Sequence, residues 1–312
     1  MQKLAKENNS NIVYSTALKN SANEEPKSFD VTFKTALKHS NATQNVYFSN
    51  YFEWQGQARE RWFMECVAKD LLQSEGVFVT AKAHNQFIEE AYPFQTIKCR
   101  VNSFDIKKTS FSLRFSFFVN GRLASIGYQT LCFSDHGKHL KKLPDAILHK
   151  IRKYEISDWR PQDTPVRLPP ITLNPNLPTL NQRYSTTFRT TLKHSNATQN
   201  VYFSNYFDWQ GAAREQWLFD MIDETLLKKD GIFITAIAHN DFKKEAFPFQ
   251  QIRCEVHTFN IQRCAFYLGF EFFHDKDLIS KGYQKVIFIN QNRRPARLPD
   301  HILDKIRLFE KL

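Results

Sequence analysis

The chain has 312 residues, 42% of them hydrophobic and 29 of them Phe, which is enough for two domains with substantial cores. Nine glycines exclude a collagen-like or glycine-rich low-complexity chain. The formal net charge of +11 is compatible with an acidic partner. A basic protein without such a partner is an equally favoured interpretation. Lys and Arg form no long block, so a nucleic-acid-binding role is not favoured.

The cysteines and the apolar runs indicate the cellular compartment in which the protein is expected. Five cysteines without a CxxC spacing argue against a zinc site held by thiolates, and the odd number suits a reducing environment. No apolar run approaches the length of a membrane span, and the first twenty residues contain no apolar signal-peptide segment. We therefore expect a cytoplasmic protein with no metal site and no membrane insertion.

The chain divides into two equivalent units. Polar residues 1–28 are expected to form a disordered extension, and a proline-rich linker is expected at 158–185. The first domain then covers 29–157 and the second covers 186–312. A constant offset of 155 relates them, since 196 − 41 and 282 − 127 both give that number for matching Asn and Gly residues. The sequence therefore contains an internal duplication of a whole domain.

Each unit has the pattern of one long helix and five strands. In the first unit, Val46 to about Gln73 carries an apolar stripe that predicts a long helix, with Glu75-Gly76 as its C-cap. Gly56 inside this helix is expected to allow a close approach to the sheet. Alternating residues predict strands, and a short helix follows them: Val31–Leu37, Val77–Glu89, Thr96–Ile106, Ser110–Asn120, Leu123–Ser134, then Pro144–Tyr154. Asn120-Gly121 predicts a hairpin turn. The expected class is α+β.

The sixteen-residue stretch LKHSNATQNVYFSNYF occurs twice without change, at 37–52 and 192–207. Its polar first half predicts a loop, and its aromatic second half predicts the start of the long helix. Amide side chains, an arginine and a glutamate thus gather at a loop-to-helix junction, where unpaired backbone N–H groups can hold a polar ligand.

The motif NxxxNVYFSNYFxWQGxARE, at Asn41–Glu60 and Asn196–Glu215, resembles hotdog-fold thioesterases of the 4-hydroxybenzoyl-CoA thioesterase-like superfamily. Within that superfamily it is most similar to the thioesterases of enediyne polyketide pathways. The resemblance implies a tandem (double) hotdog fold, in which each five-stranded antiparallel sheet wraps around one long helix. It also implies a substrate carried on the phosphopantetheine of an acyl carrier protein or on CoA, with no further cofactor.

The resemblance also implies the site residues. The wider superfamily has an acidic residue in the loop before the helix, but here that residue is an asparagine, which cannot accept a proton at neutral pH. The enediyne subfamily similarly relies on an Asn and an Arg. By position these are Asn41 with Arg59 in the first unit and Asn196 with Arg214 in the second.

The chemistry of these groups suits thioester hydrolysis, which builds negative charge on the carbonyl oxygen. An asparagine can donate to that oxygen or orient water, and an arginine can stabilise the charge. Backbone N–H groups near Asn45–Tyr47 are further candidate donors. Glu60 can act as a base or hold Arg59, and Glu53 is a weaker candidate because the second unit has Asp208. The supporting residues are Glu60, Glu215, Asn45, Asn200, Tyr47 and Tyr202.

Each of these assignments has a structural alternative. The asparagine can simply cap a turn, the arginine can be paired with a neighbouring glutamate, and the tyrosines can belong to the core or an interface. His84 and His239 are expected to pack within strands.

The expected function is hydrolysis of an acyl-ACP or acyl-CoA thioester, releasing a polyketide or fatty acyl chain. A non-catalytic hotdog protein that binds acyl chains or carrier proteins and a hotdog dehydratase are the alternatives. The expected partner is an acyl carrier protein or polyketide synthase. The units are expected to pair as an intramolecular pseudo-dimer, although pairing between chains is also open.

Overall fold

The computed structural model describes residues 26–69, 76–135, 139–157, 159–161, 183–222 and 231–311. The predictions for residues 1–25, for most of the linker and for Glu75 lie outside these residues. Strand β6 begins at Tyr184, inside the range predicted as linker. Within the described residues, none of the helices combines the length and apolar character needed to cross a bilayer.

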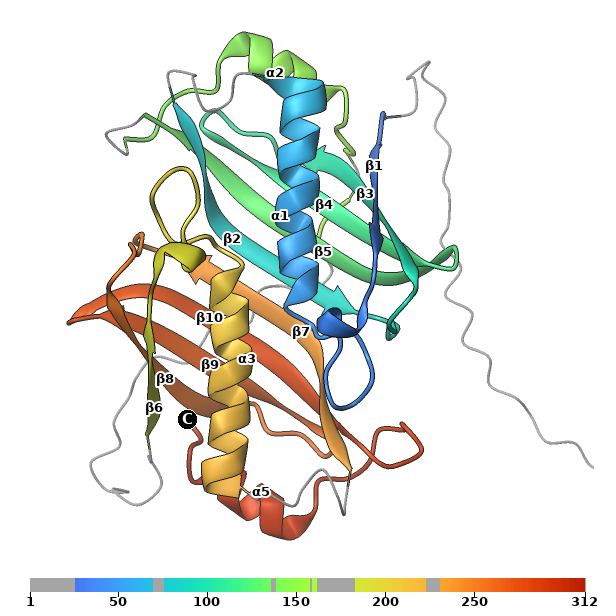
Figure 1. Ribbon diagram of the computed structural model, residues 1–312, viewed down its shortest axis with the longest axis vertical. Helices are drawn as coiled ribbons and strands as arrows, with labels where there is room; N and C mark the ends of the chain where they lie inside the picture. The colour runs from blue at the N-terminus through green and yellow to red at the C-terminus, as the bar shows by residue number, and fades with distance from the viewer. Residues whose placement is uncertain are drawn as a thin grey trace, which may run out of the picture.

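The described strands form one ten-stranded antiparallel sheet to which each unit contributes five (Figure 1). Its order is β1-β3-β4-β5-β2-β7-β10-β9-β8-β6. Central strands β2 and β7 pair with His84 opposite His239, so the sheet is continuous across the two units. The strands are β1 Phe29–Lys34, β2 Val77–Phe87, β3 Thr96–Phe104, β4 Ser110–Val119, β5 Arg122–Ser134, β6 Tyr184–Arg189, β7 Ile232–Phe242, β8 Gln251–Phe259, β9 Ala265–His274 and β10 Asp277–Ile289.

Two long helices lie on the same face of this sheet, α1 (Asn50–Trp62) and α3 (Asn205–Trp217) (Figure 1). Their N-terminal ends meet near the middle of the molecule, and they run in opposite directions. Each continues as one π-helical turn, η2 (Phe63–Val67) or η4 (Leu218–Ile222). Short helices α2 (Asp145–Arg152) and α5 (Asp300–Arg307) close the two ends.

The predicted helix boundaries are wrong at both ends. Val46 instead forms a β-bridge with Ser40, which holds the loop closed before the helix can start. At the other end Ala68 is extended, with φ −148°, so the helix ends at Val67. Gly76 allows the backbone to pass close to β5, because a Cβ there would lie 2.5 Å from the carbonyl oxygen of Ser134.

Aromatic side chains fill the space between each helix and its half of the sheet. Trp62 of α1 and Phe111, Phe115 and Phe117 of β4 are fully buried, as the alternation of apolar residues along β4 predicts. Asn120 and Gly121 both have positive φ, 51° and 78°, and confirm the hairpin turn. Each unit therefore has the predicted hotdog arrangement, and the chain is a double hotdog.

The contact between the units explains the glycine inside each helix. The rings of Phe52 and Phe207 stack with centroids 3.3 Å apart and an interplanar angle of 6°. Beside this stack, a Cβ on Gly56 would lie 2.1 Å from Oη of Tyr202, and Gly211 has the same relation to Tyr47. The prediction that Gly56 allows a close approach to the sheet is therefore wrong, since the group that needs the space belongs to the other unit.

Candidate functional site

A tight turn organises the loop that precedes α1. The Ser40–Val46 bridge closes this loop, and Gln44 adopts φ 69° to complete it. The backbone N–H and the hydroxyl of Thr43 both donate to Oδ1 of Asn41, at 3.0 and 2.6 Å. Because a backbone N–H can only donate, these contacts identify which amide atom is oxygen. The Nδ2 of Asn41 has no hydrogen-bond partner among the described residues and is left as a donor.

The expectation that Asn41 can cap a turn is thus confirmed, and it is compatible with a role in chemistry. The turn uses the oxygen of the amide and leaves its N–H groups for another acceptor. Asn196 repeats the arrangement, accepting from the backbone N–H of Thr198 at 2.9 Å and from its hydroxyl at 2.6 Å. Both asparagines are therefore held as hydrogen-bond donors.

A charged cluster fastens this loop to the second unit. Asn45 Nδ2 donates to Glu90 Oε1 at 2.6 Å, and Glu90 Oε2 is paired with Arg293 of the second unit. Nη2 of Arg293 also donates to the carbonyl oxygen of Thr43 at 2.8 Å. Asn45 therefore supports the loop, and the side chain from the opposite unit helps to fix its position.

Arg214 is a buried arginine on α3, with 6% of its surface exposed. Its Nη1 donates to Thr235 at 2.5 Å and to Gln284 at 2.8 Å, and its Nη2 donates to Glu215 at 3.2 Å. The guanidinium carbon also lies 5.2 Å from the centroid of the Phe48 ring of the other unit. An arginine has five N–H donors, so two of them, Nε–H and one on Nη2, have no acceptor among the described residues.

Tyr47 reaches across from the first unit to the same helix. Its Oη donates to Glu215 Oε1 at 2.6 Å. Burial raises the pKa of Tyr47, and the adjacent Glu215 carboxylate adds to this while Arg214 opposes it. The phenol therefore keeps its proton and remains a donor to the carboxylate.

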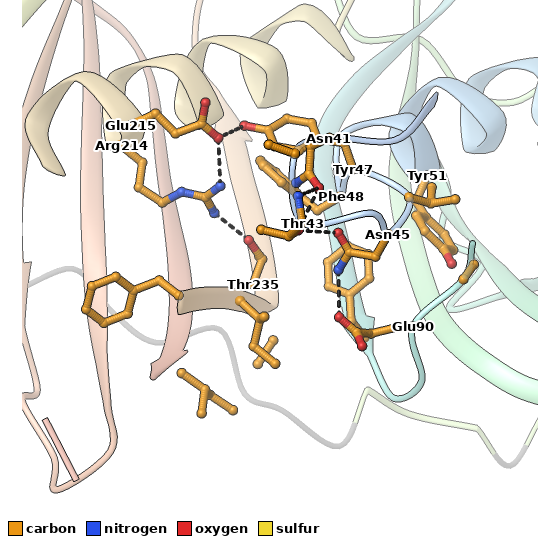
Figure 2. Close-up of a pocket in the computed structure, with 18 of the residues that line it drawn as sticks. Asn41, Thr43, Asn45, Tyr47, Phe48, Tyr51, Glu90, Arg214, Glu215 and Thr235 are labelled. Atoms are coloured by element: carbon orange, nitrogen blue, oxygen red, sulfur yellow. Dashed lines mark hydrogen bonds and ion pairs between the residues drawn. The ribbon is translucent and has the colours of Figure 1, made fainter. Parts of the chain in front are cut away.

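These groups from both units line one cavity of about 550 Å³ (Figure 2). The first unit supplies Asn41, Thr43, Asn45 and Tyr47, and the second supplies Arg214 and Glu215. Apolar side chains form much of the remaining wall, among them Phe48, Tyr51, Leu218, Phe219, Phe233 and Ile287. Arg59 is not among the lining residues. The predicted pairing of Asn41 with Arg59 is therefore wrong, because Asn41 shares its cavity with Arg214.

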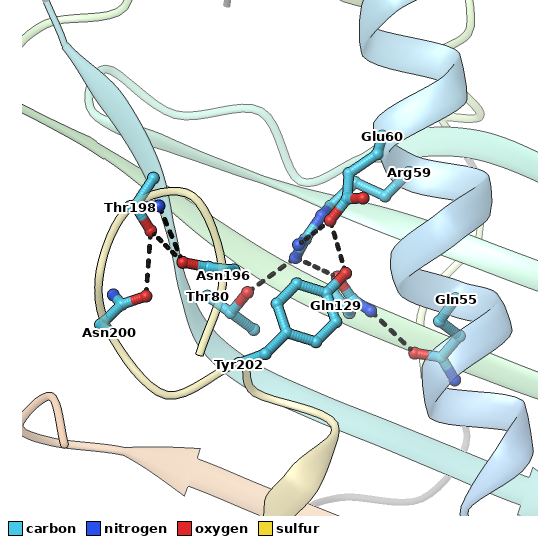
Figure 3. Close-up of polar contacts among 9 residues, drawn as sticks. All are labelled: Gln55, Arg59, Glu60, Thr80, Gln129, Asn196, Thr198, Asn200 and Tyr202. Atoms are coloured by element: carbon cyan, nitrogen blue, oxygen red, sulfur yellow. Dashed lines mark hydrogen bonds and ion pairs between the residues drawn. The ribbon is translucent and has the colours of Figure 1, made fainter. Parts of the chain in front are cut away.

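The second loop and α1 repeat this arrangement (Figure 3). Arg59, with 8% of its surface exposed, donates to Thr80 at 2.7 Å and to Gln129 at 2.8 Å. Tyr202 of the second unit donates to Glu60 Oε1 at 2.5 Å. The chain therefore contains two composite polar clusters, one on α3 with the first loop (the Arg214 site) and one on α1 with the second loop (the Arg59 site).

Some predicted donors are already occupied. The backbone N–H of Val46 bonds to Ala91 O at 2.7 Å, and that of Tyr47 bonds to His39 O at 2.8 Å. They cannot serve as the oxyanion donors that the sequence suggested near Asn45–Tyr47. Glu53 is exposed and accepts from Gln57 at 3.0 Å. It does not line the cavity, so the only predicted carboxylate there is Glu215.

Sequence reasoning missed the residues that hold the arginines and the loop. These are Thr80, Gln129, Thr235, Gln284, Thr43 and Glu90. Each polar partner of Arg59 recurs at the equivalent position beside Arg214, so comparison of the two repeats was an available signal. The histidines of β2 and β7 do pack within the sheet as expected, with the ring of His84 stacked on Tyr128 and that of His239 on Tyr283.

Comparisons with known proteins bear on this site. The sequence model of the thioesterase-like superfamily matches residues 38–151 and again residues 191–306. The search of curated proteins found no match.

Among solved structures, the chain is similar to an acyl-ACP thioesterase from Bacteroides thetaiotaomicron, with a TM-score of 0.63, 10% identity, and 84% of this chain and 97% of that chain covered. It is also similar to the 12:0-ACP thioesterase from Umbellularia californica, with a TM-score of 0.65, 9% identity, and 84% and 94% covered. The dynemicin thioesterase matches 42% of this chain over 99% of its own length, at 20% identity and a TM-score of 0.39.

Proposed function

Since the chain belongs to the thioesterase-like superfamily, we propose that it hydrolyses acyl thioesters at two composite sites, each built from the loop of one unit and the helix of the other. The observation that carries this proposal is the Arg214 cavity, where the amide of Asn41, a buried guanidinium and the Glu215 carboxylate face a largely apolar wall.

The donors in this cavity suit the charge that develops during hydrolysis. When water attacks the thioester carbonyl, negative charge appears on the oxygen, and fixed donors stabilise it without reorganising. Asn41 Nδ2 is fixed because the turn holds its oxygen, and Arg214 is fixed by Thr235 and Gln284. Both groups are pre-positioned, which is the condition under which one such donor contributes roughly 2.7–4 kcal/mol.

Glu215 is placed to handle the proton of the attacking water. Its Oε1 accepts from Tyr47 and from Arg214, and its Oε2 has no hydrogen-bond partner among the described residues. In the proposed reaction, Oε2 accepts a proton as the water oxygen bonds to the carbonyl carbon. Collapse of the intermediate then breaks the carbon–sulfur bond and gives the carboxylic acid. The departing thiolate takes the proton from Glu215 Oε2 to give the free thiol, which restores the carboxylate.

The surroundings of the cavity favour an acyl chain on a carrier. Phe48, Leu218, Phe219 and Phe233 supply apolar wall for the chain. The charge of +11 would attract an acidic acyl carrier protein or the phosphates of CoA. Two of the fold neighbours named above are acyl-ACP thioesterases, which adds support for a carrier protein as the partner. We propose release of a fatty or polyketide acyl chain in the cytoplasm.

Release of free thiol from acyl-CoA and acyl-ACP tests the proposal. We expect turnover by the intact chain and a loss of about 100–1,000-fold when both Arg59 and Arg214 are replaced by Gln. Replacement of Lys38 and Lys193, which are exposed on the same loops, by Gln is the matched control and should leave the rate nearly unchanged. Saturable binding of acyl carriers without thiol release would instead favour the non-catalytic alternative.

A further inference from the structure

The two sites share their polar groups but differ in the apolar residues behind them. At the start of the π-helical turn, the Arg214 site has Leu218 and the Arg59 site has Phe63. The next residues along the chain are Phe219 and Met64. Leu218 and Phe63 follow their arginines by four residues, so each lies on the next turn of the same helix face.

In the Arg59 half, Phe63 fills the space between the helix and the sheet. Its side chain is 1% exposed, and its ring stacks on Phe78 of β2 with centroids 4.7 Å apart at 23°. Phe78 also contacts Phe111 and Phe133, with centroids at 5.6 and 5.1 Å. This ring is therefore packed by aromatic side chains from the helix as well as from the sheet.

In the Arg214 half, none of the described aromatic side chains of the helix stacks on the equivalent ring. Phe233 of β7 contacts Phe266 and Phe288, both with centroids at 5.4 Å, which repeats the sheet contacts of Phe78. Leu218 stands where the stacking ring would be, is only partly buried, and lines the cavity together with Phe233. The cavity thus extends from the polar groups toward the core of the second unit.

We propose that the two sites differ in acyl-chain capacity: the Arg214 site admits a longer apolar chain that passes Leu218 toward Phe233, whereas Phe63 closes the same path in the Arg59 site. This inference rests on the proposed function, because it identifies the apolar wall as the acyl pocket. Leu218 and Phe63 are then the residues that set chain length, and neither takes part in the chemistry.

Binding of S-alkyl-CoA thioethers tests this directly, because a thioether keeps the chain and the carrier but cannot be hydrolysed. Calorimetric titration with the butyl, octyl and dodecyl compounds gives the number of sites per chain as well as the affinity. We expect two sites of similar affinity for butyl-CoA. For dodecyl-CoA we expect one tight site and a second that is at least about tenfold weaker.

Variants in which Leu218 and Phe63 are exchanged identify which site binds the dodecyl chain tightly. Leu218→Phe should abolish tight dodecyl binding and keep both butyl sites, whereas Phe63→Leu should create a second tight dodecyl site. Leu37→Phe is the control, because Leu37 is 67% exposed. Thermal unfolding of each variant verifies that it is folded.

Two equal dodecyl sites in the unaltered chain, or a Leu218→Phe variant with unchanged dodecyl binding, would overturn the inference. If thiol release from acyl-CoA persists in that case, the proposed function stands and only the difference between the sites is refuted. If no thioether binds and no thiol is released, both the proposed function and the inference fail.

Discussion

Gly56→Ala should have two opposing effects on stability. It raises the helix propensity of α1, but it crowds Tyr202 of the second unit, and the structure allows the two effects to be compared. An alanine in a helix interior is favoured over glycine by about 0.8–1.0 kcal/mol. The added Cβ, however, would lie 2.1 Å from Oη and 3.0 Å from Cζ of Tyr202, and 3.1 Å from a ring carbon of Phe203. The rigid tyrosine ring has to move away from the helix to relieve these contacts.

The displacement costs more than the helix gains. Forcing extra volume into a packed contact costs about 1–3 kcal/mol. It also breaks the bond from Tyr202 to Glu60, and a hydrogen bond to a charged group is worth about 1.5–3 kcal/mol when it is shielded from water. Because the Glu60 side chain is 51% exposed, we take the lower end of that range. The free energy of unfolding should therefore fall by about 2 kcal/mol.

Urea denaturation followed by tryptophan fluorescence measures this change. Gln57→Ala, at the exposed neighbouring position, is the control and should stay within about 0.5 kcal/mol of the unaltered chain. The double variant Gly56→Ala with Tyr202→Phe lacks the hydroxyl that clashes and should recover part of the loss. A Gly56→Ala protein that is more stable than the original would refute the reasoning, since helix propensity alone would then explain the result.

Three further predictions concern pH, the contact between the units and the loop. Burial, with the charge of Lys311 adding to it, lowers the pKa of His257 to about 3, so the unfolded chain binds a proton below about pH 6.5 that the folded chain does not. Its contribution to stability is complete above that pH and is lost as the pH falls. The difference in unfolding free energy between pH 7.5 and pH 5 should therefore shrink by about 2 kcal/mol in His257→Gln, and an unchanged difference would contradict the assignment. Phe52→Ala removes one ring of the central stack and should cost about 3–5 kcal/mol by urea denaturation, whereas Phe94→Ala, at a position 76% exposed, should cost little. Arg293→Gln removes the contacts that hold Glu90 and the first loop. In a variant whose Arg59 site is disabled, it should lower kcat/KM about threefold, as expected for a partly exposed ion pair. An equal loss in the neighbouring Arg294→Gln variant would rule out this explanation.

The sequence predicted the strands well because their signals are local. The alternation of apolar residues along β4 and the Asn120-Gly121 turn both reflect local geometry, and the structure confirms them. The predicted start of the helix was wrong because contacts outside the helical pattern decided it. Val46 bonds to Ala91 and bridges to Ser40, and neither partner can be read from a helical pattern.

For the site, the sequence identified the residue types but not their partners. Asn41 and Arg59 belong to one motif, and their proximity in the chain suggested a shared site. The two long helices instead start near the centre of the molecule and run apart, so each loop meets the helix of the other unit (Figure 1). Because both repeats carry the same Asn and Arg in this motif, the sequence contains no local signal that distinguishes pairing within a unit from pairing between units.

Thiol release by paired variants decides whether the sites are shared between the units. A short acyl-CoA, which both sites accept, is the substrate. Asn41→Ala with Arg214→Gln damages one composite site and should leave roughly half of the activity, whereas Asn41→Ala with Arg59→Gln damages both and should leave about 1% or less. The opposite outcome, with roughly half of the activity retained by Asn41→Ala with Arg59→Gln and almost none by the other pair, would contradict the composite sites.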